Sequence, residues 1–111
     1  MRPAAAADNL PVMLRYEVVL EMEAARSASV AEYLRDVHIP AIFATGCFRS
    51  VRLERASPTR LRASYAAGRP GDLETYLRDH APALRAEFQA RFPAGVTAIR
   101  ERWTEVAVWE E

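Results

Sequence analysis

The chain of 111 residues has no lysine, one cysteine and only four glycines. A single cysteine excludes an internal disulfide framework, and the glycines lack the spacing of a phosphate-binding loop. No apolar run approaches the roughly 20 residues that span a bilayer, so we expect no membrane partner. All 15 basic residues are arginine and are balanced by 15 acidic residues, which provides no overall positive field for nucleic acid. The absence of lysine and the excess of alanine are typical of a GC-rich bacterial genome.

The first residues differ in composition from the rest of the chain. Residues 1–12 are rich in alanine and proline and show no apolar periodicity, so we predict a disordered N-terminal extension there. Residues 13–111 are predicted to form a single domain. The opening MRPAAAADNLP lacks the apolar segment of roughly 7–15 residues found in secretory signals, and we therefore expect a cytoplasmic protein.

Apolar and polar residues alternate from Met13 onward, which predicts a strand with one apolar face. Ser29 and Glu32 have the spacing of a capping box and predict a helix that begins near Val30. Pro40 is expected to kink or interrupt this helix, because proline removes a helical hydrogen bond. Gly46 is the expected stop.

The rest of the chain repeats this alternation of strand and helix. Asp72 is a plausible N-cap for a second, long amphipathic helix that should end before Pro93 and Gly95. The other predicted strands cover Phe48–Arg55, Arg60–Ala67 and Val96–Trp109. The order β-α-β-β-α-β predicts an α+β fold, the ferredoxin-like plait, in which a four-stranded antiparallel sheet carries both helices on one face.

The other face of this sheet is predicted to carry charges of both signs. Two such faces could stack with opposite charges paired, and the apolar end of the last strand at Val108 and Trp109 would also invite association. We therefore expect a two-fold homodimer with sheet facing sheet. The charged positions on this face are Arg15, Glu17, Arg52, Glu54, Arg60 and Arg62.

One phrase occurs twice in the chain, as EYLRDVHIPA and TYLRDHAPA, and it contains both histidines. His38 could act as a general base, a ligand contact or a metal ligand. Alternatively, each imidazole could satisfy a helix carbonyl that Pro40 or Pro82 leaves without a donor, and the recurrence in both halves favours this structural role. His80 lies on the apolar stripe of the second helix, where a buried, hydrogen-bonded histidine is expected.

Four short motifs occur along the predicted domain: His38-Ile39-Pro40, Thr45-Gly46-x-Phe48, Ala81-Pro82-Ala83-Leu84 and Arg91-Phe92. Together they resemble a family of short bacterial proteins of unknown function in the dimeric α+β barrel superfamily. The resemblance covers roughly residues 13–108 and implies two ferredoxin-like plaits paired as a dimer. The wider superfamily includes monooxygenases, isomerases, haem-handling enzymes and non-catalytic regulators, and fold alone does not choose among them.

The leading hypothesis is a homodimeric domain that binds a small molecule or acts as an interaction module. The alternative is a cofactor-independent enzyme, monooxygenase- or isomerase-like, with His38 or Tyr16 near a cleft between helices and sheet. Trp103 is a further candidate ligand contact. No nucleotide motif or cluster of metal ligands appears, so neither a cofactor nor a metal is expected.

Two other classes share this order of elements. RNA-recognition modules stack bases on aromatic residues of their central strands. The corresponding exposed positions here are polar or charged, which argues against nucleic-acid binding. An amino-acid-sensing regulatory domain is the other alternative, although such domains usually accompany a catalytic domain.

Overall fold

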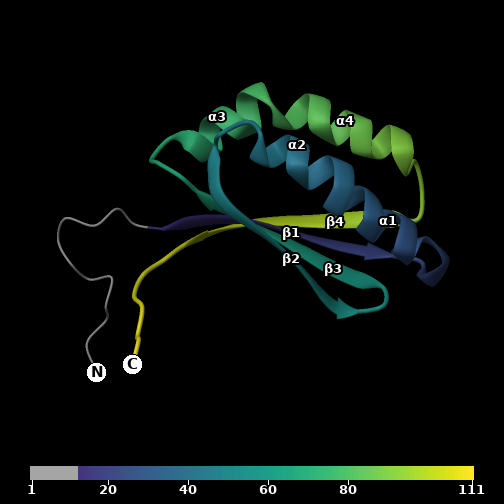
Figure 1. Ribbon diagram of the computed structural model, residues 1–111, viewed down its shortest axis with the longest axis horizontal. Coiled ribbons are helices and arrows are strands. Elements are labelled where there is room, and N and C mark those ends of the chain that lie inside the picture. The colour runs from purple at the N-terminus through teal and green to yellow at the C-terminus, as the bar shows by residue number, and fades with distance from the viewer. Residues whose placement is uncertain (1–12) are drawn as a thin grey trace.

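A computed structural model of the protein describes residues 13–111. Four antiparallel strands form one sheet in the order β2-β3-β1-β4, and all helices lie on one face of it (Figure 1). This is the predicted ferredoxin-like α+β fold. The predicted extension over residues 1–12 lies outside the described residues. The elements are β1 (Leu14–Met22), α1 (Ser27–Tyr33), α2 (Ile39–Phe43), β2 (Phe48–Ser57), β3 (Arg60–Ala67), α3 (Asp72–Asp79), α4 (Ala81–Arg91) and β4 (Val96–Thr104).

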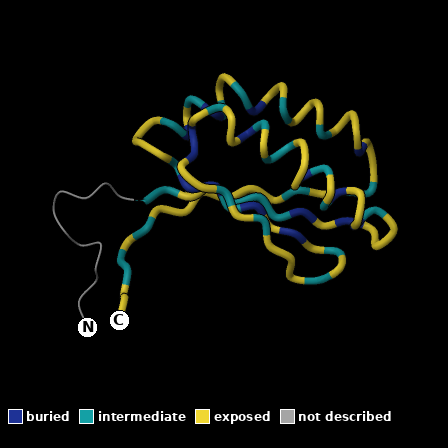
Figure 2. Tube along the Cα trace, viewed as in Figure 1, coloured by how far each residue is buried: buried dark blue, intermediate teal, exposed yellow. Residues whose placement is uncertain are grey.

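The alternation in β1 turns one set of apolar side chains toward the helices. Tyr16, Leu20 and Met22 are each at most 6% exposed. The register of β1 with β3 sets Tyr16 opposite Tyr65 and Leu20 opposite Leu61, so both strands contribute to the same layer. Figure 2 shows buried segments both on the strands and on the helices that cover them. Full burial of each large apolar side chain stabilises the fold by about 1.5–3 kcal/mol.

The first helical segment begins earlier than the sequence predicts, and the capping box does not form. A short 3-10 turn over Ala24–Arg26 leads into α1, and Arg26 at the N-cap position has no side-chain capping bond. Ser29 is exposed, whereas Ser27 donates its hydroxyl hydrogen to the carbonyl of Pro58. A contact to the β2–β3 turn therefore fixes the helix start in place of the local cap.

Pro40 is accommodated without a break in the helical backbone. A π-helical turn covers Leu34–His38, and the N–H of Ile39 donates to the carbonyl of Leu34. The wider turn sets Pro40 in the first turn of α2, where its missing N–H costs little. Gly46 then ends the segment with a positive φ of 78°, as predicted.

The predicted long second helix is two helices. His80 separates α3 from α4 with a non-helical φ of −121°, and Pro82 occupies the first turn of α4. The residue before α3 is Gly71, and Asp72 lies in the first turn, so the predicted N-cap is off by one residue. The separation at His80 follows from Pro82, which has no N–H to donate to the carbonyl of Arg78 and whose ring crowds that carbonyl.

The last strand is shorter than predicted and ends at Thr104 instead of Trp109. The reason is the length of its partner, because Thr104 pairs with Leu14, the first residue of β1. Residues 105–111 run past this end of the sheet (Figure 1). Among residues 13–111, no helix is long and apolar enough to cross a membrane.

Candidate functional site

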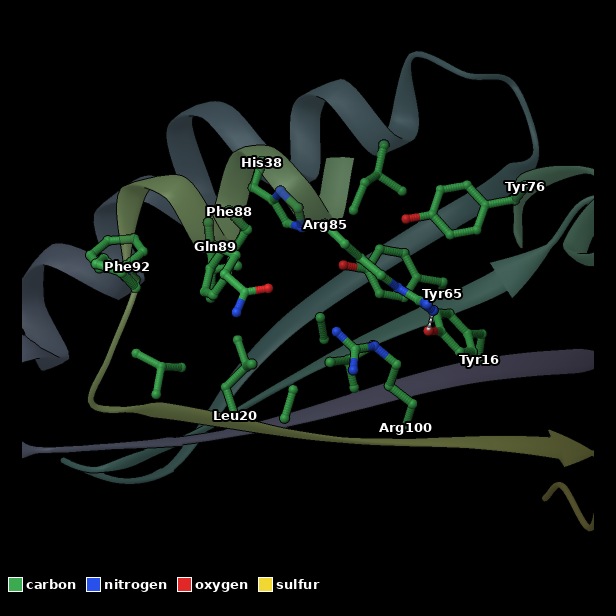
Figure 3. Close-up of a pocket in the computed structure, with 17 residues that line it drawn as sticks. Tyr16, Leu20, His38, Tyr65, Tyr76, Arg85, Phe88, Gln89, Phe92 and Arg100 are labelled. Carbon is green, nitrogen blue, oxygen red and sulfur yellow. Dashed lines mark hydrogen bonds between the residues drawn. The ribbon is translucent and has the colours of Figure 1, made fainter. Parts of the chain in front are cut away.

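A cavity of about 340 Å³ lies between the helices and the helix-facing side of the sheet (Figure 3). Four of its lining residues are exposed, and these come from α4, the segment that follows it, and β4. The cavity therefore opens between α4 and β4, at the edge of the sheet. The lining residues that the argument uses are Tyr16, His38, Tyr65, Tyr76, Arg85, Phe88, Gln89 and Arg100.

Three tyrosines form the inner end of the cavity. The ring of Tyr16 lies 5.9 Å from that of Tyr65 and 6.3 Å from that of Tyr76, between ring centroids. Burial raises the pKa of Tyr65, and it raises the pKa of Tyr76 to about 12. Both hydroxyls are thus protonated at neutral pH and available as donors, and in Figure 3 they point into the cavity.

His38 enters the cavity from the π-helical turn. Its ring stacks on Tyr33 with 6.1 Å between centroids and lies 5.2 Å from the ring of Phe88. Burial, followed by the nearby positive charge of Arg100, lowers the pKa of His38 to about 4. The imidazole is therefore neutral at physiological pH.

The structural role predicted for the two histidines is wrong. Within residues 13–111, neither imidazole hydrogen-bonds a helix carbonyl, because the π-helical turn and the separation of α3 from α4 already accommodate the prolines. His80 is half-buried and stacks on Tyr76 with 6.4 Å between ring centroids, so the predicted buried, hydrogen-bonded histidine is absent.

The repeated phrase instead produces the same local arrangement in both halves. Arg35 and Arg78 each donate two hydrogen bonds of 2.7–2.9 Å to the aspartate that follows. These pairs are exposed, and in each the two side chains bind each other. Each histidine then occupies the N-cap position of a helix with proline in its first turn.

Two arginines supply the positive charge of the cavity. Arg85 donates from Nη2 to the hydroxyl of Tyr16 at 2.8 Å, and Arg100 reaches in from β4. The cavity lining contains no acidic residue. The seven ion pairs found among residues 13–111 all use other arginines. Arg102, two residues beyond Arg100 on the same strand, is one of them and pairs with Glu74 at 2.8 Å.

The structure brings together two of the three candidate residues. Tyr16 and His38 line the same cavity, from β1 and from the turn above it. Trp103 does not belong to this site, because it lies on the opposite face of the sheet, 53% exposed. Sequence reasoning missed Arg85, Gln89, Tyr65 and Arg100. The signal for Arg100 was its alternation with Val96 and Ala98, the half-buried residues of β4.

The low pKa of His38 has a consequence for stability. An unfolded chain takes up a proton at His38 near pH 6.5, whereas the folded protein does so only near pH 4. Stability from this group is thus complete above about pH 6.5 and is lost as the pH falls toward 4. Solvent screens the partly open ring, so we expect a loss of about 1–2 kcal/mol.

The contribution of His38 to the pH dependence of stability can be measured by comparing the wild type with a variant that lacks the imidazole. Urea unfolding of the wild type and of His38→Phe should be compared at pH 7.5 and pH 4.5. The wild type should lose about 1–2 kcal/mol more than the variant over this interval. Equal losses in the two proteins would contradict a neutral, desolvated His38.

The fold and the cavity define a ferredoxin-like α+β domain with a ligand-sized space beneath its helices. Residues 13–106 match the family described as "Domain of unknown function (DUF4286)", and the chain belongs to that family. This confirms the resemblance inferred from the motifs. No curated protein matches the chain.

Solved structures share the fold at low sequence identity. A protein of unknown function, NE2512 from Nitrosomonas europaea, is 16% identical with a TM-score of 0.70, over 90% of this chain and 95% of that one. The cofactor-independent oxygenase SnoaB from Streptomyces nogalater, as the mutant N63A, is 16% identical with a TM-score of 0.64, over 89% and 98%. A dimeric ferredoxin-like protein from an uncultured marine organism is 6% identical with a TM-score of 0.66, over 91% and 100%.

Proposed function

We propose that this protein binds a small, largely aromatic molecule in the cavity between its helices and its sheet. The observation that carries the proposal is the cavity itself, whose volume of about 340 Å³ lies within the usual range of ligand sites. Most of its lining residues are apolar or aromatic, and its polar groups come from separate elements and converge on one space (Figure 3). This combination can orient a ligand through polar contacts and gives its rings apolar surface to pack against.

We also propose that two copies of the chain associate through the open face of the sheet. Ile99 and Trp103 are 54% and 53% exposed there, and Val19 pairs directly with Ile99 across the β1–β4 ladder. We call these three apolar residues at one edge of the face the apolar strip; Glu101 lies between Ile99 and Trp103 on β4. The neighbour described as a dimeric ferredoxin-like protein supports the association of two copies. The cytoplasmic location expected from the sequence stays a prediction.

A cofactor-independent enzyme is the second candidate. The observation in its favour is that His38 is neutral and faces the same cavity as Tyr16, so a ring nitrogen can accept a proton from a bound molecule. The fold of the SnoaB oxygenase supports the same class. However, a base with a pKa of about 4 has little driving force for proton abstraction at neutral pH, which places binding first.

The binding proposal is tested by filling the cavity. Ala98 is half-buried on β4 and lines the cavity, so Ala98→Phe should occupy its space without disturbing the deeper core. The affinity for 2-naphthamide, measured by the quenching of protein fluorescence, should fall at least about tenfold in this variant. Ala90→Phe, on the exposed side of α4, is the matched control and should bind as the wild type does. Equal binding by all three proteins would locate the probe elsewhere and contradict the proposal.

A further inference from the structure

The charge of the cavity lining is one-sided although the chain as a whole is neutral. Arg85 and Arg100 line the cavity, no acidic residue does, and neither arginine forms one of the ion pairs found among residues 13–111. Elsewhere in this chain, arginines commonly pair with a neighbouring carboxylate, as Arg102 does with Glu74. Two unpaired guanidinium groups near low-dielectric walls attract an anion more strongly than exposed surface charges do.

The neutral polar groups add donors to this positive field. The hydroxyls of Tyr65 and Tyr76 are protonated at neutral pH, Gln89 contributes an amide, and the neutral ring of His38 carries one N–H. Arg85 uses one of its five N–H groups on the hydroxyl of Tyr16 and keeps the others. The cavity therefore offers donors in excess, and the ligand that fits it must be rich in acceptors.

The positions of the arginines indicate how such a ligand would lie. Arg85 belongs to α4 and Arg100 to β4, the two elements that border the mouth, and Figure 3 shows their side chains entering from opposite sides. Phe88 lies beside His38, with 5.2 Å between ring centroids, and the guanidinium group of Arg85 reaches the hydroxyl of Tyr16. The two arginines thus lie between the tyrosines and the ring of Phe88 (Figure 3).

We propose that the ligand is an aromatic carboxylate that is held with its carboxylate between Arg85 and Arg100 at the mouth and its planar rings against Phe88. This rests on the proposed binding function and adds the chemical class and orientation of the ligand. A guanidinium group binds a carboxylate through two parallel hydrogen bonds, which gives affinity and fixes the direction of the rings.

The test compares two probes of the same shape. 2-Naphthoate carries the carboxylate, and 2-naphthamide replaces it with a neutral amide. Titration calorimetry at pH 7.5 and low salt should show at least about tenfold tighter binding of the acid, because charge-assisted hydrogen bonds are about twice as strong as neutral ones. Added sodium chloride should lower the affinity for 2-naphthoate more than the affinity for 2-naphthamide.

Two variants assign the effect to the mouth of the cavity. Arg100→Gln should lower the affinity for 2-naphthoate at least about tenfold and leave the affinity for 2-naphthamide nearly unchanged. Arg102→Gln removes the same charge from the same strand, outside the cavity, and should change neither affinity. Both side chains are exposed, so both variants should fold, which their circular dichroism and melting temperatures would show.

The outcomes separate this inference from the function on which it rests. Equal affinity for the two probes, with binding blocked by Ala98→Phe, would overturn the carboxylate class and keep the cavity as a binding site. An equal loss in Arg102→Gln and Arg100→Gln would show general electrostatic attraction and overturn the orientation. Binding of neither probe would overturn both proposals.

Discussion

A variant in which Ile99 and Trp103 are both replaced by glutamate is expected to be a monomer, whereas the wild type should have twice the chain mass of 12.5 kDa. Both side chains are about half exposed on the open face of the sheet. In the proposed dimer they are covered by the partner, and each carboxylate would lose its water on association, although Arg15 lies opposite position 103 and offsets part of this cost. Such a burial costs several kcal/mol, so the dissociation constant should rise at least about a hundredfold.

The measurement is light scattering over a range of micromolar concentrations. The matched control replaces Val37 and Phe43 by glutamate, because these are also about half exposed but lie in the helical layer. This control should keep the mass of the wild type. A wild type that remains monomeric at every concentration, or a control that dissociates to the same extent, would contradict association through the sheet.

The apolar strip is a stronger basis for this dimer than the charges that suggested it. Glu54 pairs with Arg62 at 2.8 Å and Glu21 with Arg60 at 3.6 Å within one protomer. These cross-strand pairs already neutralise much of the open face, and exposed ion pairs contribute only about 0–1 kcal/mol each. The sequence-based expectation that opposite charges pair between protomers is therefore not needed.

The strands could be predicted well from sequence, and the helices less well. The alternation of apolar and polar residues gave the bounds of β3 and the helix-facing side of β1, because a side-chain period of two leaves little choice of face. The helix starts depend on distant contacts. Ser27 is held by Pro58 in the β2–β3 turn, and no local pattern reports a partner so far along the chain.

The residues of the candidate site could likewise be predicted only in part from the sequence. Tyr16 was accessible to sequence reasoning because its strand is regular, and His38 because it lies two residues before Pro40 in the repeated phrase. The face of Trp103 could not be assigned from sequence, and that of Arg100 was indicated only by its alternation with Val96 and Ala98, because the two faces of β4 are both mixed in polarity. Only the register, which sets Val18 opposite Arg100 and Arg15 opposite Trp103, shows which one faces the helices.

The two most buried leucines of the helical layer are expected to respond differently to truncation. Leu73 of α3 is 1% exposed and packs in the core around Tyr76, away from the cavity lining. Leu73→Ala leaves an enclosed void and should cost about 3–5 kcal/mol, since the lost contacts add to the lost transfer free energy. For a domain of this size, that is a large fraction of the total stability.

Leu34 is 2% exposed but lines the cavity, so its truncation enlarges an existing space instead of creating a new one. Leu34→Ala should therefore cost less, about 2–3 kcal/mol, which is close to the transfer free energy of the removed atoms. It should also admit a bulkier ligand, with 2-anthroate gaining affinity relative to 2-naphthoate. Urea unfolding and paired titrations measure the two effects. An equal loss of stability in both variants, with no change in ligand preference, would show that Leu34 does not border a space that ligands can enter.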